Sequence, residues 1–205
     1  MNKTITAKDC LQILRSIKDV AFATVDKEGH PHNRIIDVML IEGNTLYFCT
    51  ARGKNFYEEL ITSKRVAIVG LNPEYKMISL QGSIQKLDHQ ENWIDKIFEA
   101  NQSMNAVYPG DSRYILEAFC IANAEIEWFD LGVNPIYRKA FTIGNEKITP
   151  KGFFITEDCI QCDTCASGCP QQCITPGEPY LINQENCLHC GYCFENCPVS
   201  AIIKK

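Results

Sequence analysis

Apolar residues recur at helical spacing in three stretches of the first 143 residues. Lys8–Ile17 predicts an amphipathic helix, because Leu11, Leu14 and Ile17 fall on one face. The same spacing predicts two further helices, over Asn55–Ser63 and Glu91–Asn101.

Between these helices, apolar and polar residues alternate with the period of a β-strand. Turn residues at 27–29 and 42–44 separate consecutive runs. Six strands are predicted, over Val20–Val25, Arg34–Ile41, Thr45–Cys49, Arg65–Gly70, Met77–Leu87 and Phe119–Leu131. Strands joined by tight turns, with a few short helices, predict a mostly β fold, a small and mostly antiparallel barrel.

The segment IGNEKITPKG, residues 143–152, breaks the pattern with two glycines, a proline and no apolar periodicity. We therefore predict a first domain of residues 1–143, a linker of residues 144–152 and a second domain of residues 153–205. The second piece has few large apolar residues and is too small to bury a sufficient core alone. Domains of this size usually need a bound metal or a covalent cross-link to be stable.

The composition, with 45% hydrophobic and 22% charged residues, is typical of a globular protein. Its formal net charge of −5 argues against a nucleic-acid binder, which would need a basic surface. No apolar run approaches the roughly 18 residues of a transmembrane helix. The N-terminal segment MNKTITAKDCLQILRSIKD is polar and lacks the apolar stretch of a signal peptide. We therefore expect a cytoplasmic protein without a membrane or nucleic-acid partner.

Cysteine changes this picture, because nine of the twelve cysteines lie within residues 159–205. A cytosolic chain seldom uses cysteine for disulfides, so such a cluster indicates metal or redox chemistry. Two C-x2-C-x2-C-x3-C-P runs repeat at a spacing of 28 residues: Cys159, Cys162, Cys165 and Cys169 before Pro170, and Cys187, Cys190, Cys193 and Cys197 before Pro198. The repeat predicts a duplicated half-domain with pseudo-twofold symmetry.

This spacing is typical of two [4Fe–4S] clusters. Three thiolates two residues apart can curl around one cubane, while the fourth reaches the other cluster. The predicted ligands are Cys159, Cys162, Cys165 and Cys197 for cluster one, and Cys187, Cys190, Cys193 and Cys169 for cluster two. Structural zinc usually takes two separated ligand pairs, and disulfides would need an export signal. The C-terminal part resembles bacterial 2[4Fe–4S] ferredoxins over nearly all its length, which implies a small α+β ferredoxin-type domain.

The remaining cysteines are not expected to bind metal. Cys173 stands where the second repeat has Ala201, which predicts a small packed thiol. Cys10, Cys49 and Cys120 are isolated in the sequence and are predicted to fill space.

The first domain offers a candidate phosphate site. It has no G-x-G-x-x-G or P-loop motif, which argues against a Rossmann dinucleotide site. Arg34 opens a predicted strand, Thr50 ends the next, and Lys54 stands where a helix is predicted to begin. Two cations and a hydroxyl near a helix N-terminus can hold a phosphate dianion. They can equally be solvated surface charges, which are the commoner case.

The order of turns and strands over residues 23–72 is more specific. A strand, a turn with Gly29, a strand carrying Arg34, a strand ending in Thr50 and Lys54 before a helix resemble the flavin-binding split barrel of the pyridoxamine 5′-phosphate oxidase-like family. The resemblance covers about residues 7–141 and implies a homodimer with FMN at the subunit interface.

Specific flavin contacts follow from this resemblance. It implies that Arg34 and Lys54 contact the phosphate, that the backbone at Ile35 and Ile36 lies along the isoalloxazine, and that Thr50 and Ala51 lie near the ribityl–phosphate end. From position alone, Trp128 or Tyr137 and Arg138 of a facing chain are further candidates.

The sequence also departs from the vitamin B6 oxidase of that family. Met77 stands where the oxidase has a flavin-contacting glutamine, and the ferredoxin-like part replaces its C-terminal substrate-binding segment. A true pyridoxamine phosphate oxidase is therefore not expected.

The leading hypothesis is an FMN- and iron–sulfur-dependent oxidoreductase that exchanges electrons with a partner protein or small molecule. No catalytic residue can be named from the sequence. An alternative is an electron-transfer or redox-sensing module without a substrate of its own, and turnover with a reduced donor would distinguish the two. A further alternative is a barrel that binds a deazaflavin or haem, which extraction of the bound molecule would identify.

Overall fold

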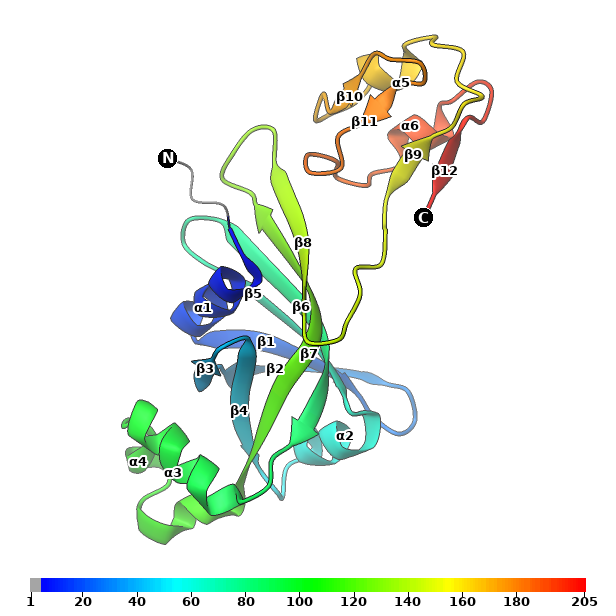
Figure 1. Cartoon of the computed structure of the whole chain (residues 1–205). Helices are drawn as coiled ribbons and strands as arrows, with labels where there is room; N and C mark the ends of the chain where they lie inside the picture. The colour runs from blue at the N-terminus through cyan, green and yellow to red at the C-terminus, as the bar shows by residue number, and fades with distance from the viewer. Residues whose placement is uncertain (1–4) are drawn as a thin grey trace. The chain divides into compact units, whose positions relative to one another are not determined.

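The computed structural model describes residues 5–205 in two compact units (Figure 1). Residues 1–4, at the start of the polar N-terminal segment considered above, lie outside the described residues. The first unit comprises the chain up to Asn72, Met77–Glu127 and Ala140–Lys147; the second comprises Pro73–Lys76, Trp128–Lys139 and Ile148–Lys205. Within residues 5–205, no helix has both the length and the apolar character that crossing a bilayer requires.

The first unit begins with helix α1, Ala7–Ile17, where the apolar spacing predicts one. A capping box determines its start: the Asp9 N–H donates to the Thr6 hydroxyl at 3.2 Å, and the Thr6 N–H donates to the Asp9 carboxylate at 3.0 Å. Cys10, Leu11 and Leu14 form its buried face.

A single sheet forms the body of this unit (Figure 1). Its strands are β1 Asp19–Val25, β2 Pro31–Asp37, β3 Leu40–Glu42, β4 Thr45–Ala51, β5 Arg65–Leu71, β6 Lys76–Lys86, β7 Leu116–Asp130 and β8 Tyr137–Ile143. They lie in the order β2-β1-β5-β6-β7-β4-β3, with β8 paired to β7. The pairings β1–β2, β1–β5, β5–β6, β3–β4 and β4–β7 are antiparallel. This curled antiparallel sheet confirms the predicted mostly β barrel fold.

Aromatic side chains fill the interior of the curled sheet. Phe48 on β4 lies 5.0 Å from Phe22 on β1 and 5.6 Å from Phe119 on β7, measured between ring centroids. Helix α2, Asn55–Ser63, adds Phe56, whose ring lies 6.1 Å from both Phe22 and Phe48. Strands far apart in the sheet order therefore pack on each other through this core.

A second apolar cluster lies beside the barrel. Helix α3, Gln90–Ala100, buries Ile94, Ile97 and Phe98 against Leu116 and Ala118. A short helix α4, Met104–Val107, and a 3₁₀ helix η1, Gly110–Ile115, lead from α3 into β7.

The structure corrects three details of the sequence-based strands. The predicted strand Arg34–Ile41 is interrupted, because the Val38 N–H donates to the Lys18 carbonyl while the Met39 N–H donates to the Tyr47 carbonyl. The chain thus passes from the side of β1 to β4 at this point. Strand β7 begins three residues before the predicted Phe119, at Leu116. Strand β8 was not predicted.

The second unit repeats itself at the spacing seen in the sequence. Its elements are β9 Phe153–Ile155, α5 Thr164–Ser167, β10 Ile174–Thr175, β11 Leu181–Ile182, α6 Tyr192–Glu195 and β12 Ile202–Lys204. Strand β9 pairs with β12, and β10 pairs with β11, both antiparallel. Backbones with positive φ also recur 28 residues apart, as at Gln172 (φ 49°) and Ser200 (φ 54°). The duplicated half-domain is therefore present in the backbone as well as in the sequence.

The three isolated cysteines of the first unit are buried, and we expect them to resist alkylation. Burial raises the pKa of Cys10 and of Cys49 to about 12 and also raises the pKa of Cys120. With a pKa of about 12, about one thiol in ten thousand is the reactive thiolate at pH 8. Iodoacetamide at that pH should label these three cysteines only after unfolding, as peptide mass spectrometry would report. Modification of Cys49 in the folded protein would contradict this burial.

Candidate functional site

The structure gathers the eight cysteines of the two runs into two cavities. Cys159, Cys162 and Cys165 line the first cavity together with Cys197 from the other run. Cys187, Cys190 and Cys193 line the second together with Cys169. The two cavities are nearly equal in volume. The groupings match the two predicted ligand sets, although the binding of iron by these residues stays a prediction.

Strand pairing explains why the fourth cysteine of each run lies in the opposite cavity. β12 follows Cys197 and pairs with β9, which precedes Cys159, so that Ile202 lies opposite Ile155. Both isoleucines line the first cavity. β10 follows Cys169 and pairs with β11 in the same manner, with Ile174 opposite Ile182. Each of these strand pairs therefore brings the last cysteine of one run close to the first cysteine of the other run.

The chemistry of these cavities suits an iron–sulfur cluster. Four thiol sulfurs face an otherwise apolar lining, for example Ile155, Val199 and Ile202 in the first cavity. Backbone amides point at sulfur, since the His189 N–H donates to Cys187 Sγ at 3.4 Å and the Ala201 N–H donates to Cys197 Sγ at 3.3 Å. Thiolate ligation, burial and N–H···S bonds are the features that hold and tune such clusters.

Burial disfavours the thiolate form of the most buried cysteines in the second cavity. Burial raises the pKa of Cys187, and it raises the pKa of Cys193 to about 11. Metal binding deprotonates such thiols, because the ion's charge outweighs the desolvation of the thiolate. Cys162 differs: the Thr164 side chain lowers the pKa of this exposed thiol.

Cys173 adds a fifth thiol to the second cavity. It is buried, as predicted for a packed thiol, and it also lines the cavity beside the four predicted ligands. Its Sγ lies 3.5 Å from Cys169 Sγ. The sequence analysis did not place Cys173 in this cavity. The available signal was its spacing, because three residues lie between Cys169 and Cys173, as between Cys165 and Cys169.

In the first unit, the end of β4 and the start of α2 offer groups that fit an anionic cofactor. Lys54 is the N-cap of α2 and makes no side-chain capping bond. Thr50 is buried on β4, and its hydroxyl has no hydrogen-bond partner among the described residues. Ala51 ends β4, and its carbonyl accepts from the Lys54 N–H at 3.1 Å. A cation at a helix N-terminus and an unsatisfied buried hydroxyl four residues before it in the chain are suited to phosphate binding.

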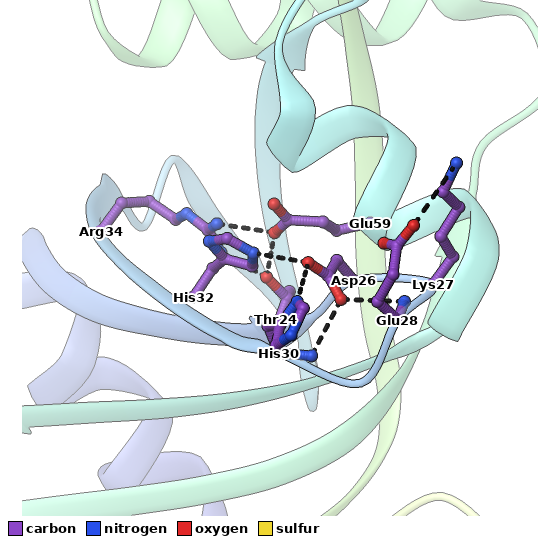
Figure 2. A network of polar contacts seen from close by, with 8 residues as sticks. All are labelled: Thr24, Asp26, Lys27, Glu28, His30, His32, Arg34 and Glu59. Carbon is purple, nitrogen blue, oxygen red and sulfur yellow. Dashed lines mark hydrogen bonds and ion pairs between the residues drawn. The ribbon is translucent and has the colours of Figure 1, made fainter.

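Arg34 lies on strand β2, and its side chain contacts helix α2 in a partly buried network (Figure 2). Its Nη2 lies 2.6 Å from the carboxylate of Glu59, whose side chain is only 5% exposed. Its Nη1 donates to the Thr24 hydroxyl, which in turn donates to Glu59. The guanidinium also lies 4.6 Å from the ring centroid of Phe56, in the first turn of α2. Glu59 thus neutralises Arg34, and phosphate contact by Arg34 stays a prediction.

Sequence reasoning missed Glu59, whose burial on an otherwise ordinary helix has no local signal. Next to it, a cavity of about 240 Å³ is lined by four acidic side chains and one lysine: Asp26, Glu28, Glu58, Glu59 and Lys27. The His32 side chain holds the pKa of Asp26 well below its usual range, so Asp26 is charged at neutral pH (Figure 2). A cavity of this charge disfavours a phosphate group.

Ile35 and Ile36 point to opposite faces of the edge strand β2. Ile36 lies opposite buried Val20 on β1, whereas Ile35 lies opposite Ala21 and is 63% exposed. Exposed Val69 on β5 flanks Ala21 on the other side. The outer face of these strands is therefore apolar and open.

The three candidates named from position alone, Trp128 near the end of β7 and Tyr137 and Arg138 at the start of β8, belong to the second unit. The rings of Trp128 and Tyr137 lie 5.6 Å apart. Arg138 donates its backbone N–H to the Glu185 carbonyl at 2.7 Å, and its Nη1 lies 2.8 Å from His189 Nδ1. These contacts give Arg138 a structural role in its own chain, and a role in a facing chain stays a prediction.

Comparison with known families identifies the class of protein. Residues 6–128 match the family model described as pyridoxamine 5′-phosphate oxidase, and residues 158–201 match that of a 4Fe-4S dicluster domain. The first match spans more than half of the chain, which therefore belongs to the pyridoxamine 5′-phosphate oxidase family. No curated protein matches the chain.

Solved structures share the fold of the first unit. A NimC/NimA family protein from Clostridium acetobutylicum is 20% identical with a TM-score of 0.57, over 67% of this chain and 93% of that one. A protein from the same organism related to general stress protein 26 of B. subtilis is 15% identical with a TM-score of 0.52, over 69% and 97%. A heme binding protein from Mycobacterium smegmatis is 15% identical with a TM-score of 0.53, over 68% and 59%.

Proposed function

We propose that this protein is an oxidoreductase that passes electrons between an FMN bound by the barrel and two [4Fe–4S] clusters in residues 153–205. The observation that carries the proposal is the pair of cavities, each lined by four cysteines drawn from both runs. Membership of the pyridoxamine 5′-phosphate oxidase family, which is typical of flavin-binding barrels, supports the proposed FMN site. Flavins exchange one or two electrons and the clusters exchange one at a time, so the pair can couple two-electron to one-electron chemistry.

Each residue set has its own part in this proposal. Cys159, Cys162, Cys165 and Cys197 would hold cluster one, and Cys187, Cys190, Cys193 and Cys169 would hold cluster two. On the flavin side, Lys54 would neutralise the phosphate and the Thr50 hydroxyl would donate to it. Arg34 would orient the start of α2 through Glu59, while the backbone at Ile35, Ile36 and Ala51 would border the ring and the ribityl chain.

We also propose that the active form is a homodimer. Ile35 and Val69 lie on the apolar outer face of β2, β1 and β5, and Leu71 further along β5 is exposed as well. A soluble monomer rarely leaves such a contiguous apolar face uncovered. Because Ile35 is also a predicted flavin contact, a second copy on this face would complete the flavin site. Light scattering of the flavin-loaded protein would test this, and a monomeric mass would contradict it.

A reducing compartment suits this assignment. All twelve cysteines are free in the structure, and most of them line the two cavities. Thiols in such number persist in the cytoplasm and would be oxidised outside it. We therefore propose a cytoplasmic location.

The decisive experiment is cofactor analysis of anaerobically purified protein. We expect one flavin per chain, with the iron and acid-labile sulfide of two cubane clusters. Protein that binds iron but no flavin would contradict the proposed FMN site in the barrel. Zinc in place of iron would contradict the proposed [4Fe–4S] clusters. Extraction also tests a haem in the barrel, an alternative favoured by the shared fold of the heme binding protein from Mycobacterium smegmatis.

Turnover separates an enzyme from a redox sensor. Anaerobic mixing with a reduced donor, followed by an electron acceptor, should bleach the flavin and then restore its absorbance repeatedly. A flavin that is reduced once and never reoxidised by any acceptor would favour a sensing module.

Replacing Lys54 by Gln should weaken FMN binding about tenfold, because a charge-assisted contact to phosphate is lost. Lys64→Gln is the matched control, since Lys64 is also exposed and stands at the opposite end of the same helix. Fluorescence titration of flavin-free protein would measure both dissociation constants. Equal affinities of the two variants would contradict a phosphate site at the start of α2.

A further inference from the structure

The two cavities of the second unit differ in one chemically important position. Cys173 faces the second cavity, is 6% exposed, and lies with its Sγ 3.5 Å from that of Cys169. In the first cavity the equivalent position is Ala201, which is also buried and offers no ligand atom. The second cavity therefore has five thiols where a cubane needs four.

The backbone makes the same turn in both halves, so the side chain is the relevant difference. The Gln172 N–H donates to the Cys169 carbonyl at 3.0 Å, and the Ser200 N–H donates to the Cys197 carbonyl at 3.2 Å. Both turn residues have positive φ. The chain thus directs Cys173 to the side of Cys169 just as it directs Ala201 to the side of Cys197.

Resting on the proposed clusters, we propose that Cys173 is a reserve ligand that can replace Cys169 on cluster two. The exchange breaks the bond between iron and Cys169 Sγ and forms one between iron and Cys173 Sγ. The proton of the Cys173 thiol passes to the departing Cys169 sulfur, with which it is in contact. No electron is transferred, so the cluster keeps its oxidation state and its four thiolates.

Cys169 is the ligand for which such a replacement is available. The other three predicted ligands of cluster two come from one loop, Cys187–Cys193, whereas Cys169 comes from the other repeat. Loss of Cys169 would otherwise open one iron of the cube to solvent. Cluster one has no such protection at Cys197. We therefore expect cluster two to survive damage to its remote ligand and cluster one to be lost by the equivalent damage.

The repeat supplies matched variants for the test. Anaerobically purified Cys169→Ala should retain the iron and sulfide content of the unmodified protein, because Cys173 completes the ligand set. Cys197→Ala should lose the iron of cluster one or convert it to a three-iron cluster with its own electron paramagnetic resonance signal. The double variant Cys169→Ala/Cys173→Ala should show the same loss at cluster two. Cys173→Ala alone should keep both clusters.

A transplant tests the same idea even if Cys169→Ala fails to accumulate. Adding Ala201→Cys to the Cys197→Ala variant should restore cluster one, since it recreates the arrangement of the second cavity. The proposal is overturned if Cys169→Ala loses as much iron as the double variant, or if the transplant restores none. It is also overturned if Cys173→Ala alone loses cluster two, which would make Cys173 an ordinary ligand. Absence of clusters from the unmodified protein would instead contradict the proposed function.

Discussion

Removal of iron by a chelator should unfold residues 153–205 while the first unit stays folded. Three of the seven buried side chains in the core of this small unit are the cysteines Cys173, Cys187 and Cys193. Its strands are only two or three residues long. A core of this size cannot offset the conformational entropy of its chain, so the clusters would supply most of its folding free energy.

Hydrogen exchange with mass spectrometry would measure this effect peptide by peptide. After chelation, amides of β9 and β12 should exchange at the rate of an unfolded chain, whereas those of α1, β4 and β7 should keep their protection. Protein carried through the same buffers without chelator is the control. If β9 and β12 stayed protected after complete iron loss, the apolar lining alone would hold the unit and the clusters would have no structural role.

The second large effect concerns the barrel interior. Phe48→Ala should lower the free energy of unfolding of the first unit by about 3–5 kcal/mol, the usual cost of removing a buried phenylalanine. The side chain has no exposed surface and its ring contacts Phe22, Phe56 and Phe119. These neighbours come from β1, α2 and β7, so they cannot easily collapse together into the cavity.

Urea unfolding of the iron-loaded protein, followed by circular dichroism in the β-sheet region, would provide this measurement. Val107→Ala is a suitable control, because Val107 is 65% exposed on α4 and its truncation should change stability by no more than about 0.5 kcal/mol. A loss below about 1 kcal/mol for Phe48→Ala would mean that the curled sheet is not packed around this ring.

Much of the fold could be predicted because its signals are local. The helical spacing of Leu11 and Leu14 corresponds to α1, and strand alternation places β1, β4 and β5 within a residue or two. Strand β8 was missed because Lys139 and Ala140 interrupt the alternation of apolar and polar residues along it, although Gly132 and Pro135 signal a turn before it. The break of the predicted strand Arg34–Ile41 was missed because its cause is a change of hydrogen-bonding partner from Lys18 to Tyr47.

By itself, the sequence determined the two cysteine runs and their 28-residue repeat, because ligand spacing along a chain is a local geometric constraint. The pairing of β12 with β9 and of β10 with β11 then places each fourth cysteine in the opposite cavity. Only the tertiary structure decided what surrounds them. It joins Arg34 to Glu59, 25 residues away, and sets Cys173 beside Cys169 in the second cavity. The first contact does not follow from periodicity, because it depends on where helix α2 brings Glu59. The second follows from a local turn, but the cavity that Cys173 lines is completed by Cys187, Cys190 and Cys193 of the other repeat.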